Sequence, residues 1–100
     1  MFEKIGLKIN IKGIVQGVGF RPFVYSVAKK NGLKGWVRNS SNGVEIEIFG
    51  DPAGVERFLE EIKNFPPPLS RIDNFTSMEI SNKHYEDFSI VESINPLSLR

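Results

Sequence analysis

A short glycine-containing segment has the clearest capacity for chemistry in this chain. It reads Val15-Gln16-Gly17-Val18-Gly19-Phe20-Arg21-Pro22. Gly17 and Gly19 permit positive φ, a backbone conformation in which successive N–H groups can converge on one anion. The guanidinium of Arg21 can bind two phosphate oxygens at once. We therefore predict a phosphate-binding loop made of Gln16, Gly17, Val18, Gly19, Phe20 and Arg21.

The helix that should follow this loop has no obvious cap. Pro22 is predicted at its first position, and no Ser, Thr, Asp or Asn directly precedes that proline. The first-turn N–H groups therefore lack a side-chain acceptor, which a bound anion would supply at the positive end of the helix. The alternative is a tight strand-to-helix turn with a surface arginine, because two-glycine motifs alone often arise without function.

Composition limits the other possibilities. The chain has 100 residues, a net charge of +1 and no cysteine. This length fits one small domain, the near-neutral charge gives no general attraction to nucleic acid or membrane, and disulfides, thiolate nucleophiles and Cys-based metal sites are excluded. No stretch resembles a secretory signal or a membrane span, so we expect a cytoplasmic protein. We also expect no metal and no cofactor, since neither an aspartate cluster nor a P-loop lysine is present.

The hydrophobic pattern predicts two helices among several short strands. Expected strands are 7–11, 36–38, 44–49, 71–81 with an imperfect alternation or a bulge, and 88–91, and expected helices are 21–31 and the segment that starts at Asp51-Pro52 and must end before Pro66-Pro67-Pro68. The predicted core consists of Leu7, Ile9, Phe23, Val24, Val27, Ile46 and Ile48. This β-α-β-β-α-β order with a short extra strand indicates an α+β, ferredoxin-like split βαβ sandwich, with both helices on one face of a mostly antiparallel sheet.

Several other polar residues have simpler interpretations. His84 stands in a polar run and is interpreted as a solvated loop histidine rather than a base or metal ligand. Glu45 and Glu47 alternate with apolar residues and are interpreted as surface charges rather than a catalytic pair. Lys29 and Lys30 fall in the last predicted helical turn, where they fit the negative helix end.

The segments 15–21 and Gly35-Trp36-Val37-Arg38-Asn39 resemble the two signature stretches of acylphosphatases, and the likeness extends over almost the whole chain. The separation between Arg21 and Asn39 also matches the family's catalytic pair. The resemblance implies that the loop and Arg21 hold a phosphoryl group and that Asn39 orients the attacking water, without a metal. On its own, Asn39 before Ser-Ser-Asn-Gly would be interpreted as a turn residue.

A narrower resemblance points to the N-terminal domain of hydrogenase-maturation carbamoyltransferases. It rests on Gly19 to Val24, on Pro66 to Asp73 and on Phe88 to Ser93. It implies an acylphosphatase-like domain over 1–93 with a frayed tail over 94–100, carbamoyl phosphate as a substrate, and other maturation proteins as partners of a longer chain. A stand-alone acylphosphatase shares the same site. A non-catalytic anion- or RNA-binding module of the same fold is the third alternative, against which stand the few aromatic residues on the central strands.

Overall fold

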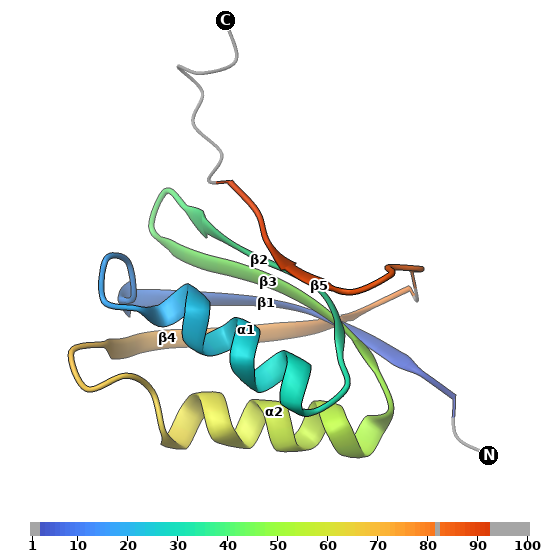
Figure 1. Cartoon of the computed structure of the whole chain (residues 1–100). Coiled ribbons are helices and arrows are strands. Elements are labelled where there is room, and N and C mark those ends of the chain that lie inside the picture. The colour runs from blue at the N-terminus through green and yellow to red at the C-terminus, as the bar shows by residue number, and fades with distance from the viewer. Residues whose placement is uncertain (1–2, 82, 93–100) are drawn as a thin grey trace, which may run out of the picture.

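The computed structural model describes residues 3–81 and 83–92, which form a sheet covered on one face by two helices (Figure 1). The elements along the chain are β1 (Ile5–Ile14), α1 (Phe20–Lys30), β2 (Lys34–Ser40), β3 (Gly43–Gly50), α2 (Pro52–Asn64), β4 (Arg71–Ile80) and β5 (Phe88–Ile90). The predicted element order and the extra terminal strand are confirmed. The predicted domain end at residue 93 and the tail 94–100 lie outside the described residues.

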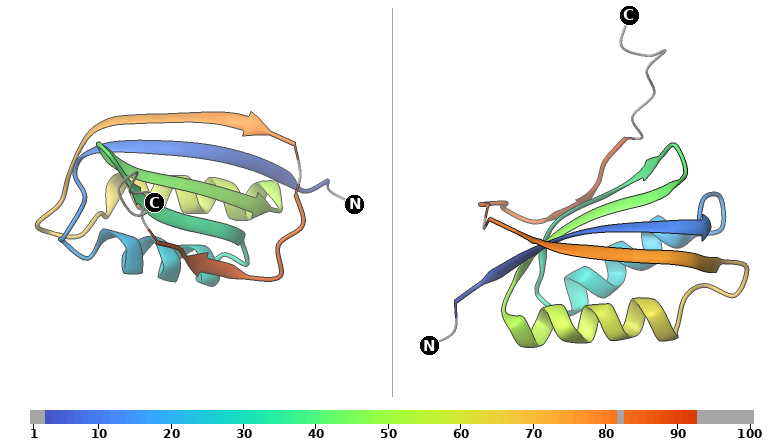
Figure 2. Two further views of the ribbon diagram at one scale, coloured as in Figure 1. Left: turned by 90° about the horizontal axis from the view of Figure 1, so that it is seen from above. Right: turned by 180° about the vertical axis from the view of Figure 1, so that it is seen from behind.

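The five strands form one mixed sheet in the order β4-β1-β3-β2-β5. The neighbours are antiparallel except β2 and β5, which are parallel. The mostly antiparallel sheet with both helices on one side is therefore confirmed, and the two further views show the same layering (Figure 2). The sheet register shifts between Lys12 and Gly13 of β1 against β4, so the predicted irregularity of the last long strand is a bulge.

The core lies between the sheet and the helices. Most of the predicted core side chains are buried there, as are Phe20, Phe58 and Ile62. Leu7 and Phe23 are exceptions, because they are only partly buried and pack at the margin of the core. Burial of one large apolar side chain stabilises the fold by about 1.5–3 kcal/mol, so this layer holds the site's supporting elements in place.

The prediction that Glu47 is a surface charge is wrong. Glu47 is 5% exposed, on the sheet face opposite the helices. Residues after β4 cover it, with the Tyr85 hydroxyl 3.5 Å and the Lys83 Nζ 3.4 Å from its Oε1. The alternation along β3 correctly places Glu47 on the sheet face away from the helices, but it does not show that a later segment covers that face. Glu45 keeps more solvent contact and pairs with Arg38 at 2.8 Å.

Neither helix is long and apolar enough to cross a membrane, within the part of the chain that the structure describes.

Candidate active site

The glycine-containing loop connects β1 to α1 at one end of the sheet (Figure 1). Gly17 and Gly19 have φ of 74° and 80°, and no described residue other than glycine has a positive φ. Alternation of negative and positive φ from Gln16 to Gly19 is the conformation that makes a concave nest of N–H groups. A Cβ placed on either glycine would meet nothing within 4 Å. The space above the loop is therefore open to a ligand, and backbone conformation rather than crowding requires the glycines.

The backbone N–H groups of residues 16–21 have no acceptor elsewhere in the described chain. The first helical bond of α1 runs from the Phe23 N–H to the Gly19 carbonyl at 3.2 Å. Gly19 is the N-cap residue and offers no side-chain bond, and the first turn contains no acidic residue. The predicted uncapped helix start is thus confirmed, and it leaves a group of donors at the positive end of α1.

The position of Pro22 differs from the prediction. The helix begins at Phe20, so Pro22 is its third residue and not its first. Proline has no backbone N–H, and its absence costs no hydrogen bond anywhere in the first turn, because the N–H groups there have no intrahelical acceptor. The consequence is that Arg21 also belongs to the helix, one residue before the proline.

Arg21 is half-buried on the first turn of α1. Its guanidinium forms no ion pair or hydrogen bond with another residue of 3–81 and 83–92, whereas Arg38 and Arg71 are both paired with carboxylates. An arginine held beside unbonded N–H groups without a carboxylate partner can bind an anion with no internal bond to break first.

Asn39 lies near this helix start, although it comes from a different element. It pairs with Val44 across the β2–β3 hairpin, so its side chain points to the sheet face on which Val44 is buried and the helices pack. Helix α1 packs against β2 and runs antiparallel to it, which places the N-terminus of α1 over the end of β2 that carries Asn39 (Figure 1). The structure therefore brings Asn39 and the anion loop to the same end of the fold.

The side chain of Asn39 has an unmet acceptor. Its Oδ1 is buried without a hydrogen-bond partner, and it is the one such side-chain atom among the described residues. A buried polar atom without a partner costs about 1–3 kcal/mol, so such an atom calls for a physical explanation. A ligand or water that donates to Oδ1 would supply the missing bond.

The side chain of Gln16 has a role that sequence reasoning missed. Its Nε2 donates to the carbonyl oxygens of Ser40 at 2.6 Å and of Gly43 at 2.8 Å. The side chain therefore joins the loop to the hairpin, and only its backbone N–H is available to an anion. No local pattern could have shown this, because the partners are 24 and 27 residues away.

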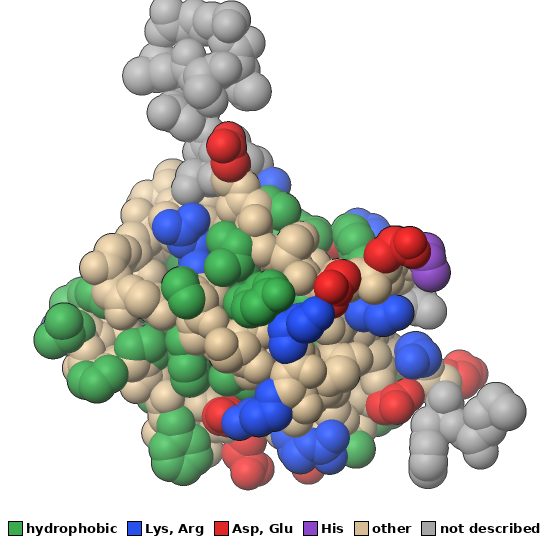
Figure 3. Space-filling view, in the orientation of Figure 1, with side chains coloured by type: hydrophobic (Ala, Val, Ile, Leu, Met, Phe, Trp, Pro, Cys, Tyr) green, Lys and Arg blue, Asp and Glu red, His purple; other side chains and the backbone are tan. Residues whose placement is uncertain are grey.

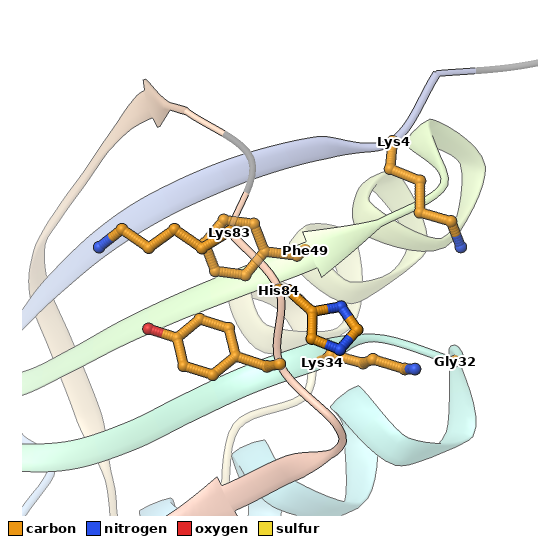
Figure 4. Close-up of a pocket in the computed structure, with 7 residues that line it drawn as sticks. Lys4, Gly32, Lys34, Phe49, Lys83 and His84 are labelled. Carbon is orange, nitrogen blue, oxygen red and sulfur yellow. The ribbon is translucent and has the colours of Figure 1, made fainter.

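Two hollows larger than the one beside the loop do not contain the predicted catalytic pair. One of about 400 Å³ lies at the other end of the sheet, among Lys4, Lys34, Lys83 and His84 above Phe49 (Figure 4). His84 is exposed there, as predicted, and does not lie near Arg21. A smaller hollow of about 250 Å³ adjoins the loop and is lined by Gly13, Ile14, Val15, Gln16, Ser41, Asn42 and Gly43.

Charged side chains are few on the part of this face where the loop lies. In the space-filling view, most acidic and basic side chains lie over the right half and along the lower edge, while apolar side chains gather toward the left, next to a small basic group (Figure 3). Ile14, Phe65 and Leu69 are among the exposed apolar residues of the segments at this end. Lys29 and Lys30, in the last turn of α1 as predicted, pair with Asp87 and Glu61 and leave no single-sign basic patch around them.

No group of three or more His, Asp or Glu residues that could hold a metal ion occurs among the described residues. The groups that the structure places at the loop are backbone N–H groups, a guanidinium and a carboxamide, which together can bind and orient a phosphoryl group.

Comparison with known proteins agrees with this arrangement. The acylphosphatase family model matches residues 7–90. A probable carbamoyltransferase HypF of Methanocaldococcus jannaschii is 52% identical over 93 residues, which are 92% of this chain and 12% of that protein. An acylphosphatase of Thermotoga maritima is 46% identical over 85 residues, which are 84% of this chain and 93% of that protein.

The structural comparison gives the same result. A crystal structure of full-length HypF in a phosphate- and nucleotide-bound form superposes with a TM-score of 0.91 and 49% identity, over 93% of this chain and 12% of that chain. The chain thus spans about one eighth of the length of the carbamoyltransferase relatives and nearly all of an acylphosphatase. The family model covers residues 7–90, and both sequence and fold match relatives over most of the chain, so the chain belongs to the acylphosphatase family.

Proposed function

We propose that residues 16–21 bind the phosphoryl group of an acyl phosphate and that Asn39 positions the water that attacks it. The observation that carries this proposal is the buried Oδ1 of Asn39, which lacks a partner beside a group of N–H donors that also lack acceptors. A phosphoryl group can accept hydrogen bonds from the loop N–H groups, and a water can donate one to the Asn39 Oδ1. Together the N–H groups and the Oδ1 describe a site for one anion and one water.

The reaction requires little beyond these groups. The phosphoryl oxygens accept from the loop N–H groups and from Arg21, so the charge that builds up on them is stabilised by donors already in place. The water donates one hydrogen to the Asn39 Oδ1, which directs its lone pair toward phosphorus. The bond between phosphorus and the acyl oxygen breaks, and the carboxylate leaves with that bond's electrons. The carboxamide of Asn39 orients the water without taking its proton, because an amide is not a base at neutral pH. That proton passes to a phosphoryl oxygen, so the products are the free carboxylate and inorganic phosphate.

Carboxyl phosphates suit such a site because their leaving group is a stable carboxylate. In the described part of the chain, the one histidine, His84, lies at the other end of the sheet and is not placed to protonate a poor leaving group. A carboxylate needs no such proton, and positioning with charge stabilisation is then sufficient. We infer a preference for small acyl phosphates, with carbamoyl phosphate favoured by the similarity to the carbamoyltransferases.

The biological context follows from the same relatives. We propose that this domain acts as the first module of a hydrogenase-maturation carbamoyltransferase in the cytoplasm, together with other maturation proteins. The support is the greater identity to a HypF protein than to a stand-alone acylphosphatase, 52% against 46%. A metabolic acylphosphatase remains the second candidate, because that relative matches this chain over nearly its whole length.

A phosphate-release assay with benzoyl phosphate and carbamoyl phosphate, compared side by side, tests the proposal. We expect hydrolysis of both by the wild-type chain, with the higher kcat/KM for carbamoyl phosphate, and loss of both in Arg21→Ala. If the folded protein releases phosphate from neither compound, the proposed hydrolysis is contradicted. A clear preference for benzoyl phosphate would favour the metabolic acylphosphatase.

A further inference from the structure

We propose that Gln16 is a positioning residue, which sets the distance between the anion loop and the Asn39 amide by holding the β2–β3 hairpin. This inference rests on the proposed function. It assigns the Gln16 side chain to the hairpin, whereas the sequence alone placed Gln16 among the phosphate-binding residues. Its backbone N–H remains part of the anion loop, so one residue belongs to both halves of the site.

Two contacts carry the inference. The Gln16 Nε2 donates to the carbonyl of Ser40 at 2.6 Å and to that of Gly43 at 2.8 Å. These carbonyls stand on either side of the two-residue turn at 41–42, so a single NH₂ group uses both of its hydrogens to hold the two strands of the hairpin together. Ser40 directly follows Asn39. A shift of the Ser40 carbonyl therefore shifts the backbone of Asn39 as well.

Among the described residues, no other side chain bonds to the Ser40 or Gly43 carbonyl. Asn39 and Ser40 are at the last two register positions of β2, after which the strand is no longer paired with β3. Among residues 3–81 and 83–92, β5 pairs with β2 through Gly35, Trp36 and Val37, and no described strand lies on the outer edge of the part of β2 that carries Asn39. A hairpin end with one neighbouring strand opens easily, and its position then depends on added contacts.

The side-chain donor is what matters in this account. Gln16→Met keeps the length and the unbranched shape of the side chain but removes both hydrogens, with no change in charge. We expect kcat for an acyl phosphate to fall about 10- to 100-fold, the effect of a misplacement of about 1 Å at a reacting centre. The inhibition constant of inorganic phosphate should stay within twofold, because the loop N–H groups and Arg21 remain.

A double-mutant cycle separates positioning from general weakening. If Gln16 acts through Asn39, Gln16→Met should lower kcat little further when Asn39 is already alanine. Glu45→Gln serves as the matched control, because it weakens a side-chain contact on the opposite face of the same hairpin, the 2.8 Å pair with Arg38. It should leave kcat within twofold of wild type.

A readout independent of turnover tests the contact itself. Ser40 and Gly43 are the last paired residues of the hairpin. In the wild-type chain, hydrogen exchange at their amides should be slow, and Gln16→Met should speed it while exchange along α2 is unchanged. If Gln16→Met speeds exchange in this way but the wild-type chain hydrolyses no acyl phosphate, the proposed function is contradicted while the contact between Gln16 and the hairpin stands. Unchanged exchange would overturn the contact. Three results would overturn the positioning role. One is a wild-type kcat in Gln16→Met, and another is a double mutant whose loss of kcat equals the product of the losses in Gln16→Met and Asn39→Ala. The third is an inhibition constant of phosphate that rises in proportion to KM.

Discussion

Asn39 lies directly opposite Val44 in the β2–β3 hairpin, and the Val44 side chain is 1% exposed. Cross-strand partners project from the same face of a sheet, so this register turns a carboxamide toward the layer that otherwise holds apolar side chains. Among the described residues, no N–H or O–H group donates a hydrogen bond to its Oδ1 in that layer. The register thus places a polar atom without a hydrogen-bond partner at the end of the fold where α1 starts. Such an atom lowers the stability of the fold and can accept a hydrogen bond from a water.

Replacement of Arg21 by lysine tests the anion contact. Lysine keeps the positive charge but loses the planar pair of donors that matches phosphate oxygens. We expect kcat/KM to fall about 10²- to 10³-fold, as for loss of one donor to transition-state charge. The melting temperature should change little, because Arg21 has no partner in residues 3–81 or 83–92. Near-wild-type hydrolysis by Arg21→Lys would show that the guanidinium is a surface group.

Inorganic phosphate should bind the loop of residues 16–21 and stabilise the fold. A ligand that binds only the folded state adds about 2.7 kcal/mol at 100 times its Kd. We expect a dose-dependent rise in Tm and NMR shift changes centred on the amides of residues 16–21, with both effects reduced in Arg21→Ala. Shift changes confined to the hollow at Lys34 and His84 would place the anion at the other end of the sheet.

The sequence was sufficient for the element order, the bulge and the positive φ of Gly17 and Gly19, because these depend on local patterns and on the special freedom of glycine. It was not sufficient for contacts between distant segments. Burial of Glu47 depends on a segment that crosses the sheet 36 to 38 residues later, and the Gln16 side chain is held by carbonyls beyond α1. The resemblance predicted Arg21 and Asn39 as the catalytic pair. The buried Oδ1 of Asn39 without a partner depends on how distant segments pack, which no local pattern shows.

Replacement of Gly17 by alanine should separate activity from packing. The new Cβ meets no atom within 4 Å, but φ of 74° is strained for a residue with a side chain. We expect a loss of stability of only about 1–2 kcal/mol from this conformation, with a much larger fractional loss of kcat/KM as the N–H groups turn away from the anion. Denaturant unfolding and a phosphate-release assay measure the two effects. Equal activity in the variant would mean that the nest does not bind the phosphoryl group.

The contact between Lys29 and Asp87 predicts a pH effect on stability. The Lys29 ammonium at 2.5 Å, and next the Phe88 N–H at 2.8 Å, lower the pKa of Asp87 below its ordinary value of 3.8. A carboxylate with a lowered pKa in the folded state stabilises the fold above the unfolded pKa, and this effect is lost as the pH falls through the folded pKa. Asp87→Asn should therefore lower Tm at pH 7 but not at pH 2. Thermal unfolding at both pH values measures this, and an equal difference at both would exclude the ionic contribution.

The most direct test compares kcat and phosphate affinity in Asn39→Ala and Arg21→Ala. If Asn39 positions water while Arg21 holds the phosphoryl group, Asn39→Ala should lower kcat about 10²-fold and leave the inhibition constant of inorganic phosphate within twofold. Arg21→Ala should weaken both. Asn39→Ala should melt at or above the wild-type temperature, because its Oδ1 accepts no bond in the folded chain. Full turnover by folded Asn39→Ala, or a defect in phosphate affinity alone, would contradict the account.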